Sequence, residues 1–212
     1  MTGVIFDLDG TLLDTLAGIA YSANETLAAN GLSTHPVSAY KEFVGAGVKV
    51  LFERAAPGQN PEPIIADFLS RYERSWLSNS HVYAGVLDML KLLQEQNMPM
   101  AILSNKPQVF VDQAIQGPLK SISFRVALGH QPRKPLKPER GSADEAIEAI
   151  GLPRTRITMV GDTPIDIETA QTHGMNSVAV SWGFRPVEEL TSADAICHSA
   201  DELGAFLLDL PC

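Results

Sequence analysis

The sequence predicts an α/β fold, with a Rossmann-like, doubly wound parallel sheet as its core and an inserted α-helical cap subdomain. Two observations lead to this prediction. Beyond residue 81, short apolar runs of strand length alternate with helical segments, which is typical of βαβ units around a parallel sheet. A block of helical periodicity interrupts this alternation directly after the first strand. We therefore expect residues 1–14 and 82–212 to form the core and residues 15–81 to form the cap.

The N-terminal part of the chain predicts one strand followed by several helices. Residues 3–8 are apolar and β-branched at their start, which is typical of a buried strand. A helix begins near Leu16 and ends at Asn30-Gly31, a plausible C-cap. Glycine and proline separate the further helical segments. These are predicted at residues 38–44, 48–55 and 63–77.

The remainder of the chain predicts alternating helices and strands. Helices are expected at residues 86–96, 108–115, 142–150, 165–173 and 200–208. Strands are expected at residues 100–103, 124–128, 157–160, 176–180 and 194–197. Because ligands of open α/β sheets bind at the carboxyl ends of the strands, we expect the functional cleft to lie between this edge and the cap.

The composition limits the classes of function. The chain has 212 residues, 45% of them hydrophobic, which is enough to bury a core. A net charge of −9 argues against a nucleic-acid or membrane-surface binder, because either would need a basic face. Cys197 and Cys212 belong to no CxxC pair, so neither a disulfide framework nor a zinc site is expected. No signal peptide or membrane-spanning run is visible, and we expect a cytoplasmic protein.

Two aspartates close the first predicted strand. Residues i and i+2 of an extended chain point to the same side, so Asp7 and Asp9 can approach one site. Gly10 permits a tight turn after them. Two carboxylates this close tolerate each other only beside a cation or with a shared proton. The alternative is an acidic turn that begins a helix, with Asp14 as its N-cap.

A second acidic strand end lies late in the chain. Asp162 follows an apolar strand directly, and Asp166 lies one helical turn later. Together with the first pair, these carboxylates would form a hard oxygen site that suits Mg²⁺. An N-cap role for Asp162, with Pro164 in the first turn of the helix, is the structural alternative.

Polar and cationic groups complete the set of candidates. Ser104 and Asn105 end another strand with groups that can hold phosphate oxygens, although both residues are also common N-caps. Residues 133–140 form a cationic cluster on an acidic protein. One of its lysines, Lys134 or Lys137, could neutralise a transferring phosphoryl group. A solvated basic loop is the alternative.

In order and spacing, these segments resemble the haloacid dehalogenase superfamily of phosphohydrolases. The family pattern is a strand ending in DxDGT, a later strand ending in Ser or Thr, a lysine loop and an acidic GD strand end. The lysine loop departs from the usual Lys-Pro-x-Pro, and the distance to the GD strand end favours Lys137 over Lys134. Phosphoglycolate phosphatases are the most similar subgroup. The strings that support this subgroup lie at residues 44–47, 104–107 and 181–184.

The resemblance implies a Mg²⁺-dependent phosphatase that acts on a small phosphorylated metabolite such as phosphoglycolate. It implies that Asp7 forms an aspartyl-phosphate and that Asp9 acts first as an acid and then as a base. Asp7, the backbone carbonyl of Asp9, and Asp162 would hold Mg²⁺, with Asp166 orienting the lysine or a metal-bound water. The substrate-binding candidates are Gly10, Thr11, Ser104, Asn105 and Lys137.

Several alternatives remain open at this stage. A sugar phosphomutase, a pyrophosphatase or a nucleotidase of the same fold would carry the same motifs. A haloacid dehalogenase is disfavoured, because it would need neither Asp9 nor Asp162. A non-enzymatic phospho-receiver module is disfavoured by the helical insertion after the first strand. We expect no nucleic-acid or membrane partner, and either a monomer or a homodimer.

Overall fold

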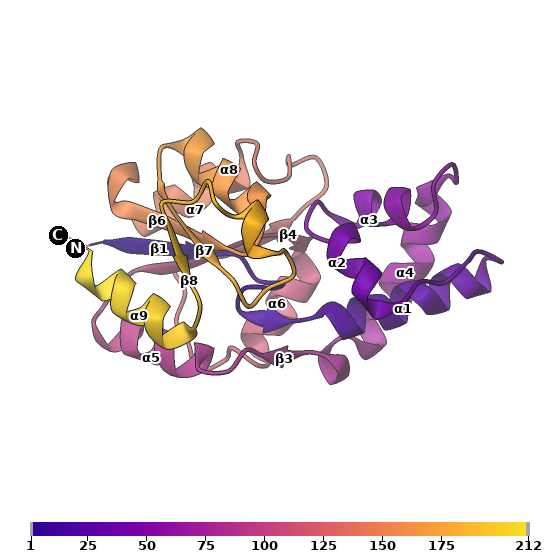
Figure 1. Cartoon of the computed structure of the whole chain (residues 1–212), viewed down its shortest axis with the longest axis horizontal. Helices are drawn as coiled ribbons and strands as arrows, with labels where there is room; N and C mark the ends of the chain where they lie inside the picture. The colour runs from indigo at the N-terminus through magenta and orange to yellow at the C-terminus, as the bar shows by residue number, and fades with distance from the viewer. Residues whose placement is uncertain (1, 211–212) are drawn as a thin grey trace.

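The computed structural model describes residues 2–210, which are built around a six-stranded parallel sheet (Figure 1). The strand order is β5-β4-β1-β6-β7-β8, and every neighbouring pair is parallel. The predicted α/β class is therefore confirmed. The strands are β1 (Gly3–Phe6), β4 (Met100–Pro107), β5 (Ala127–His130), β6 (Ile157–Gly161), β7 (Asn176–Val180) and β8 (Ala195–Cys197).

Helices cover both faces of this sheet (Figure 1). One face carries α5 (Val86–Glu95), α6 (Gln108–Gln116) and α9 (Ala200–Asp209), and the other carries α7 (Ser142–Ile150) and α8 (Pro164–His173). Side chains of β1 alternate between the faces: Val4 and Phe6 pack with the first group, and Ile5 packs with the second. Burial on both sides explains why this strand is continuously apolar.

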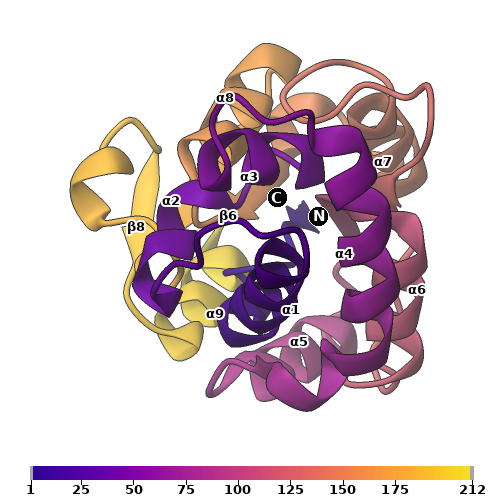
Figure 2. The ribbon, with the colours of Figure 1, turned by 90° about the vertical axis from the view of Figure 1, so that its right-hand side faces the viewer.

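Four further helices form a separate group, which we call the helical block. They are α1 (Leu16–Ala29), α2 (Tyr40–Phe43), α3 (Val48–Ala55) and α4 (Pro61–Ser75). The block lies beyond the end of the sheet toward which β1 runs, and its helices surround a shared interior (Figures 1 and 2). The apolar residues of this interior are continuous with the core on the α5, α6 and α9 face.

The chain passes into and out of the helical block through a pair of short strands. These strands, β2 (Leu13–Asp14) and β3 (His81–Val82), are antiparallel, with Leu13 opposite Val82 and Asp14 opposite His81. Two-residue strands carry no periodic pattern, so the sequence could not predict them. Their pairing brings the two connections of the block together.

Several element boundaries differ from prediction. The strand expected at residues 124–128 is found at Ala127–His130, because Phe124 packs against the core from a loop and not from a strand. The strand expected to end at Leu103 continues to Pro107, with an irregularity in its pairing to β5. None of the described helices is long and apolar enough to cross a membrane.

Candidate active site

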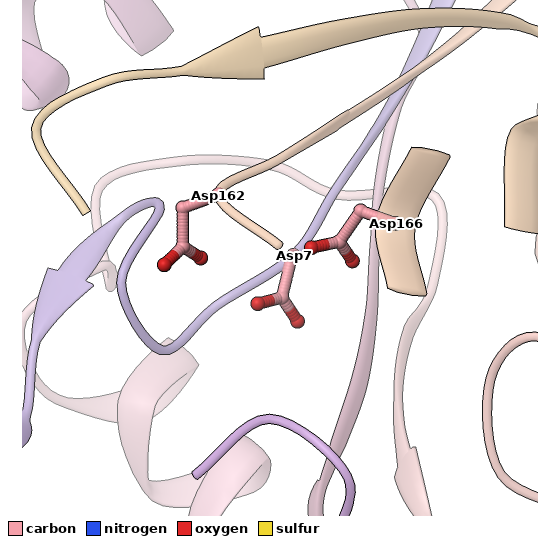
Figure 3. Close-up of side chains that lie close together, drawn as sticks. All are labelled: Asp7, Asp162 and Asp166. Carbon is pink, nitrogen blue, oxygen red and sulfur yellow. The ribbon is translucent and has the colours of Figure 1, made fainter. Parts of the chain in front are cut away.

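Three carboxylates meet at the carboxyl ends of two neighbouring strands. Asp7 follows β1 directly, Asp162 follows β6, and Asp166 lies in the first turn of α8. Carboxylate oxygens of these three residues lie within 4.8 Å of one another, and all three side chains are buried (Figure 3). We call them the acid cluster. The structure thus brings together the two acidic strand ends that lie far apart in the sequence.

Asp162 is held at full burial by neutral donors. Its carboxylate accepts hydrogen bonds from Thr11 Oγ1 at 3.1 Å and from the backbone N–H of Phe184 at 2.8 Å. Burial, and then the charges of Asp7 and Asp166, raise the pKa of Asp162 well above its ordinary value. The N-cap of α8 is Thr163, so the interpretation of Asp162 as that cap is wrong.

The backbone closes tightly around Asp162. A Cβ atom on Gly10 would stand 2.3 Å from an Asp162 carboxylate oxygen, and a Cβ on Gly183 would stand 2.2 Å from the Asp162 Cβ. Gly10 also has a φ of +89°, a conformation that side chains disfavour. Both positions therefore require glycine, and Gly10 lies against the acid cluster.

Lys137 bridges two members of the acid cluster. Its ammonium donates to Asp7 Oδ1 and to Asp166 Oδ1, both at 2.7 Å. Burial alone would lower the pKa of Lys137. The negative charges of Asp166 and Asp7 outweigh this effect and hold the pKa of Lys137 above its ordinary value. Lys134 instead pairs with Glu145 near the surface, at 2.7 Å. Of the two lysines left open by the sequence, Lys137 is the one that reaches the cluster.

Asp166 is fixed at the start of α8 by a capping box. Its Oδ2 accepts from the backbone N–H of Thr163 at 3.1 Å and from the Thr163 hydroxyl at 2.7 Å. Its other oxygen accepts from Lys137, which also contacts Asp7. Thr163 was absent from the sequence-based candidates, although its position three residues before Asp166 is the sequence signature of a capping box.

The acid cluster carries an excess of negative charge. Burial raises the pKa of Asp7 to about 6; Lys137 opposes this rise, and the charges of Asp166 and Asp9 add to it. Three buried carboxylates face one ammonium, and Asp162 has no cationic partner among the contacts of the described residues. Hard oxygen donors with uncompensated charge fit a divalent cation such as Mg²⁺.

The Asp9 carboxylate points to a different partner. It forms an ion pair with the ammonium of Lys106, with distances of 2.9 and 3.0 Å to its two oxygens. Lys106 also donates to the Tyr72 hydroxyl at 2.7 Å, and its ammonium lies over the rings of Tyr72, Trp76 and Phe110. We call these three rings the aromatic cage. Burial lowers the pKa of Lys106, and the charge of Asp9 opposes that shift.

Sequence reasoning missed the position of Lys106. In the sequence, Lys106 stands out only as part of the string at residues 104–107. Its partners come from the turn after β1, from α4 and its C-terminus, and from α6, and no local pattern reports contacts between such distant segments. The strand was predicted to end at Leu103, three residues before Lys106, so nothing in the sequence indicates that this lysine is buried in β4.

Ser104 and Asn105 lie at the end of β4 beside these groups. The Ser104 hydroxyl accepts from the backbone N–H of Lys106 at 3.3 Å. The Asn105 side chain accepts from the Lys137 N–H at 2.8 Å and donates to the Gly45 carbonyl at 3.1 Å. Asn105 therefore links the lysine loop to the loop between α2 and α3.

A cavity lies between the helical block and the strand ends. Its polar wall consists of Asp7, Asp9, Ser104, Asn105 and Lys106. Its other wall is largely apolar and comes mainly from the helical block, with Ile19, Val44, Val48, Leu51 and Phe68. Among the described residues that line it, Lys106 is the cationic one. A small ligand in this cavity would contact both Asp7 and Asp9.

Comparisons with known proteins agree with this geometry. The sequence model of the haloacid dehalogenase-like hydrolases matches residues 4–180. A phosphoglycolate phosphatase from Rhodobacter capsulatus is 34% identical, over 93% of this chain and 90% of that protein. One from Mesorhizobium japonicum is 31% identical, over 92% and 90%.

Solved structures show the same likeness across the whole fold. A predicted phosphatase from Clostridium acetobutylicum superposes with a TM-score of 0.86 at 26% identity, covering 99% of this chain and 100% of that one. A predicted phosphoglycolate phosphatase from Haemophilus somnus gives a TM-score of 0.83 at 25% identity, with 97% of each chain covered.

Proposed function

Because the chain belongs to the haloacid dehalogenase-like hydrolases and is a phosphoric monoester hydrolase, we propose that it is a Mg²⁺-dependent phosphoglycolate phosphatase. Its substrate is phosphoglycolate or a similarly small phosphate monoester. The names of its curated relatives support this substrate. The observation that supports the chemistry most directly is the contact of Lys137 with both Asp7 and Asp166 inside the acid cluster.

Asp7 is the proposed nucleophile. Its carboxylate attacks the phosphorus, the bond from phosphorus to the leaving oxygen breaks, and an aspartyl-phosphate forms. Lys137 holds the nucleophile in place and stabilises the negative charge that develops on the phosphoryl oxygens. Ser104 and the backbone around Gly10 and Thr11 bind these oxygens.

Asp9 is the proposed acid and base. It donates a proton to the leaving alcohol in the first step. In the second step it removes a proton from the water that attacks the aspartyl-phosphate; the bond from phosphorus to Asp7 breaks, and inorganic phosphate and free Asp7 result. It lines the same cavity as Asp7, which supports a position beside the leaving group. The leaving alcohol departs into this cavity.

The acid cluster is the proposed metal site. Asp7, Asp162 and the backbone carbonyl of Asp9 hold Mg²⁺, and Asp166 orients Lys137. When bound, Mg²⁺ offsets the repulsion between the Asp7 carboxylate and the incoming phosphate. The buried excess of carboxylate charge supports this assignment.

The helical block is the proposed cap. Residues 15–81 cover the cavity, and residues 1–14 and 82–212 carry the chemistry. The apolar wall of the cavity and the hydrogen bond from Asn105 to the Gly45 carbonyl support this division. A closed cap excludes bulk water from the site and limits the size of the leaving group.

A phosphate-release assay tests the proposal. The purified chain, with Mg²⁺, is given phosphoglycolate, pyrophosphate, nucleotides and hexose phosphates, and each reaction is repeated with EDTA. We expect phosphoglycolate to have the highest kcat/KM and EDTA to abolish its hydrolysis. Faster hydrolysis of pyrophosphate or a nucleotide, or isomerisation of a sugar phosphate without phosphate release, would reject the substrate assignment. Full activity in EDTA would reject the metal.

A further inference from the structure

We propose that Lys106 is a positioning residue that fixes the Asp9 carboxylate beside the leaving group, in a setting built jointly by the sheet and the helical block. The proposal rests on the proposed function, because it takes Asp9 to be the acid. It adds a residue that acts through Asp9 and does not touch the phosphoryl group.

The Lys106 ammonium has three acceptors. They are the two oxygens of Asp9, at 2.9 and 3.0 Å, and the Tyr72 hydroxyl, at 2.7 Å. A contact to both oxygens restrains the rotation of the carboxylate as well as its position. The Lys106 side chain is 3% exposed, whereas that of Asp9 is 18% exposed. Both residues line the cavity, and Asp9 is the more exposed of the two.

The aromatic cage comes from two parts of the molecule. Tyr72 and Trp76 belong to α4 and its C-terminus, in the helical block, and Phe110 belongs to α6, beside the sheet. The Trp76 indole N–H donates to Gln113 Oε1 of α6 at 2.6 Å, which ties the two helices together. The support of Asp9 is therefore complete only while α4 is packed against α6.

Stability alone does not explain a lysine at this position. Burying an ammonium costs several kcal/mol, and a buried ion pair is often no more stable than an apolar replacement of similar volume. The cage offsets part of this cost through cation–π contacts. What the lysine does provide is a fixed orientation of the Asp9 carboxylate. Such an orientation matters for the rate, because displacing a reacting group by about 1 Å can slow a reaction roughly 10²-fold.

The test compares Lys106→Met with the wild-type chain on three substrates. Methionine preserves an unbranched apolar stem in the cage and removes the ammonium. Ethyl phosphate and phosphoglycolate have alcohol leaving groups that need a proton, whereas p-nitrophenyl phosphate has a leaving group that needs none. Because kcat/KM reports the first chemical step, it isolates the proton donation by Asp9. Lys91→Met is the matched control, since Lys91 also pairs with an aspartate, Asp88, but on the surface.

We expect kcat/KM to fall by roughly 10²-fold or more for ethyl phosphate and phosphoglycolate in Lys106→Met. The fall for p-nitrophenyl phosphate should be only about threefold, and KM should change little. If Lys106→Met does not fold, Tyr72→Phe takes its place, because it removes only the hydroxyl that accepts from the Lys106 ammonium. In Tyr72→Phe, kcat/KM for ethyl phosphate and phosphoglycolate should fall by about three- to fivefold, and kcat/KM for p-nitrophenyl phosphate should fall less.

Each other outcome overturns the proposal. An equal loss on all three substrates would mean that Lys106 only supports the fold. A loss confined to phosphoglycolate would assign Lys106 to binding the substrate's carboxylate. A higher kcat/KM for ethyl phosphate in Lys106→Met would mean that the ammonium hinders proton donation. A wild-type chain that hydrolyses none of the three with Mg²⁺ would instead reject the proposed function itself.

Discussion

The Lys137 ammonium lies 2.7 Å from Asp7 Oδ1, across 130 positions of sequence. The same nitrogen contacts Asp166, which is itself fixed by the capping box at the start of α8. The position of the proposed nucleophile is therefore set through a chain of contacts that ends in a helix terminus.

Replacing Lys137 by methionine should lower kcat by roughly 10²–10³-fold, because the transition state loses a buried cation beside the phosphoryl group. The variant should also lose about 3 kcal/mol of unfolding free energy without Mg²⁺, since two buried carboxylates lose their partner. Steady-state kinetics and urea unfolding measure the two effects. Lys134→Met removes a surface ion pair and should stay within about twofold of wild-type kcat. Equal losses in both variants would contradict the role of Lys137.

Replacing Asp7 by asparagine should abolish turnover while the protein remains folded, because an amide cannot attack phosphorus. Asp9→Asn should also turn over poorly, but it can still accept phosphate and should accumulate a phosphorylated form. Mass spectrometry of acid-quenched reactions detects this adduct on Asp7. A wild-type rate in Asp7→Asn, or no adduct in any variant, would count against the covalent route.

Mg²⁺ should raise the melting temperature of the wild-type chain. Ligand at about ten times its Kd adds roughly 1.4 kcal/mol of stability. Asp162→Asn should lose this response, and without metal it should be more stable than wild type, because it removes a buried charge that Asp7 and Asp166 repel. Thermal unfolding with Mg²⁺ and with EDTA measures both effects. An undiminished Mg²⁺ response in Asp162→Asn would place the metal elsewhere.

The stability of the metal-free chain should depend on pH through Asp7. Its pKa is raised from 3.8 to about 6 in the folded state, so the folded chain binds this proton more tightly than the unfolded chain does. The resulting stability is fully present below pH 3.8 and is lost as pH rises through about 6. It amounts to at most about 3 kcal/mol.

The difference between wild type and Asp7→Asn isolates this contribution. Urea unfolding in EDTA at about pH 5 and about pH 8 should show a steeper loss of stability in the wild type. Asp209→Asn, which changes an exposed aspartate, serves as the control and should follow the wild type. If the unfolding free energies of wild type and Asp7→Asn change equally with pH, the pKa of Asp7 is not raised in the folded chain.

The parts of the site that the sequence predicted share one physical basis. Asp7 and Asp162 directly follow apolar strands, and in a parallel sheet the carboxyl ends of neighbouring strands share one edge. The sequence therefore predicts that Asp7 and Asp162 lie at the same edge of the sheet, even without the order of the strands. Lys137 could be chosen over Lys134 only through the family resemblance, because nothing local distinguishes two lysines in a basic loop.

The support of Asp9 could not be predicted in this way. It depends on how α4 packs against α6, and such packing is decided by tertiary contacts between Trp76, Phe110 and their neighbours. The short strands β2 and β3 were missed for a related reason, since their pairing is non-local. Periodicity identifies elements and their ends, whereas contacts between distant elements become visible only in three dimensions.

The pairing of β2 with β3 has an evolutionary consequence. Because the two connections of the helical block lie next to each other, the block behaves as an insert with adjacent ends. Inserts of this kind can be lengthened, shortened or exchanged by recombination without changing the register of the host sheet. The helical block, which is the proposed cap, can therefore diversify at a different rate from the sheet within a single gene.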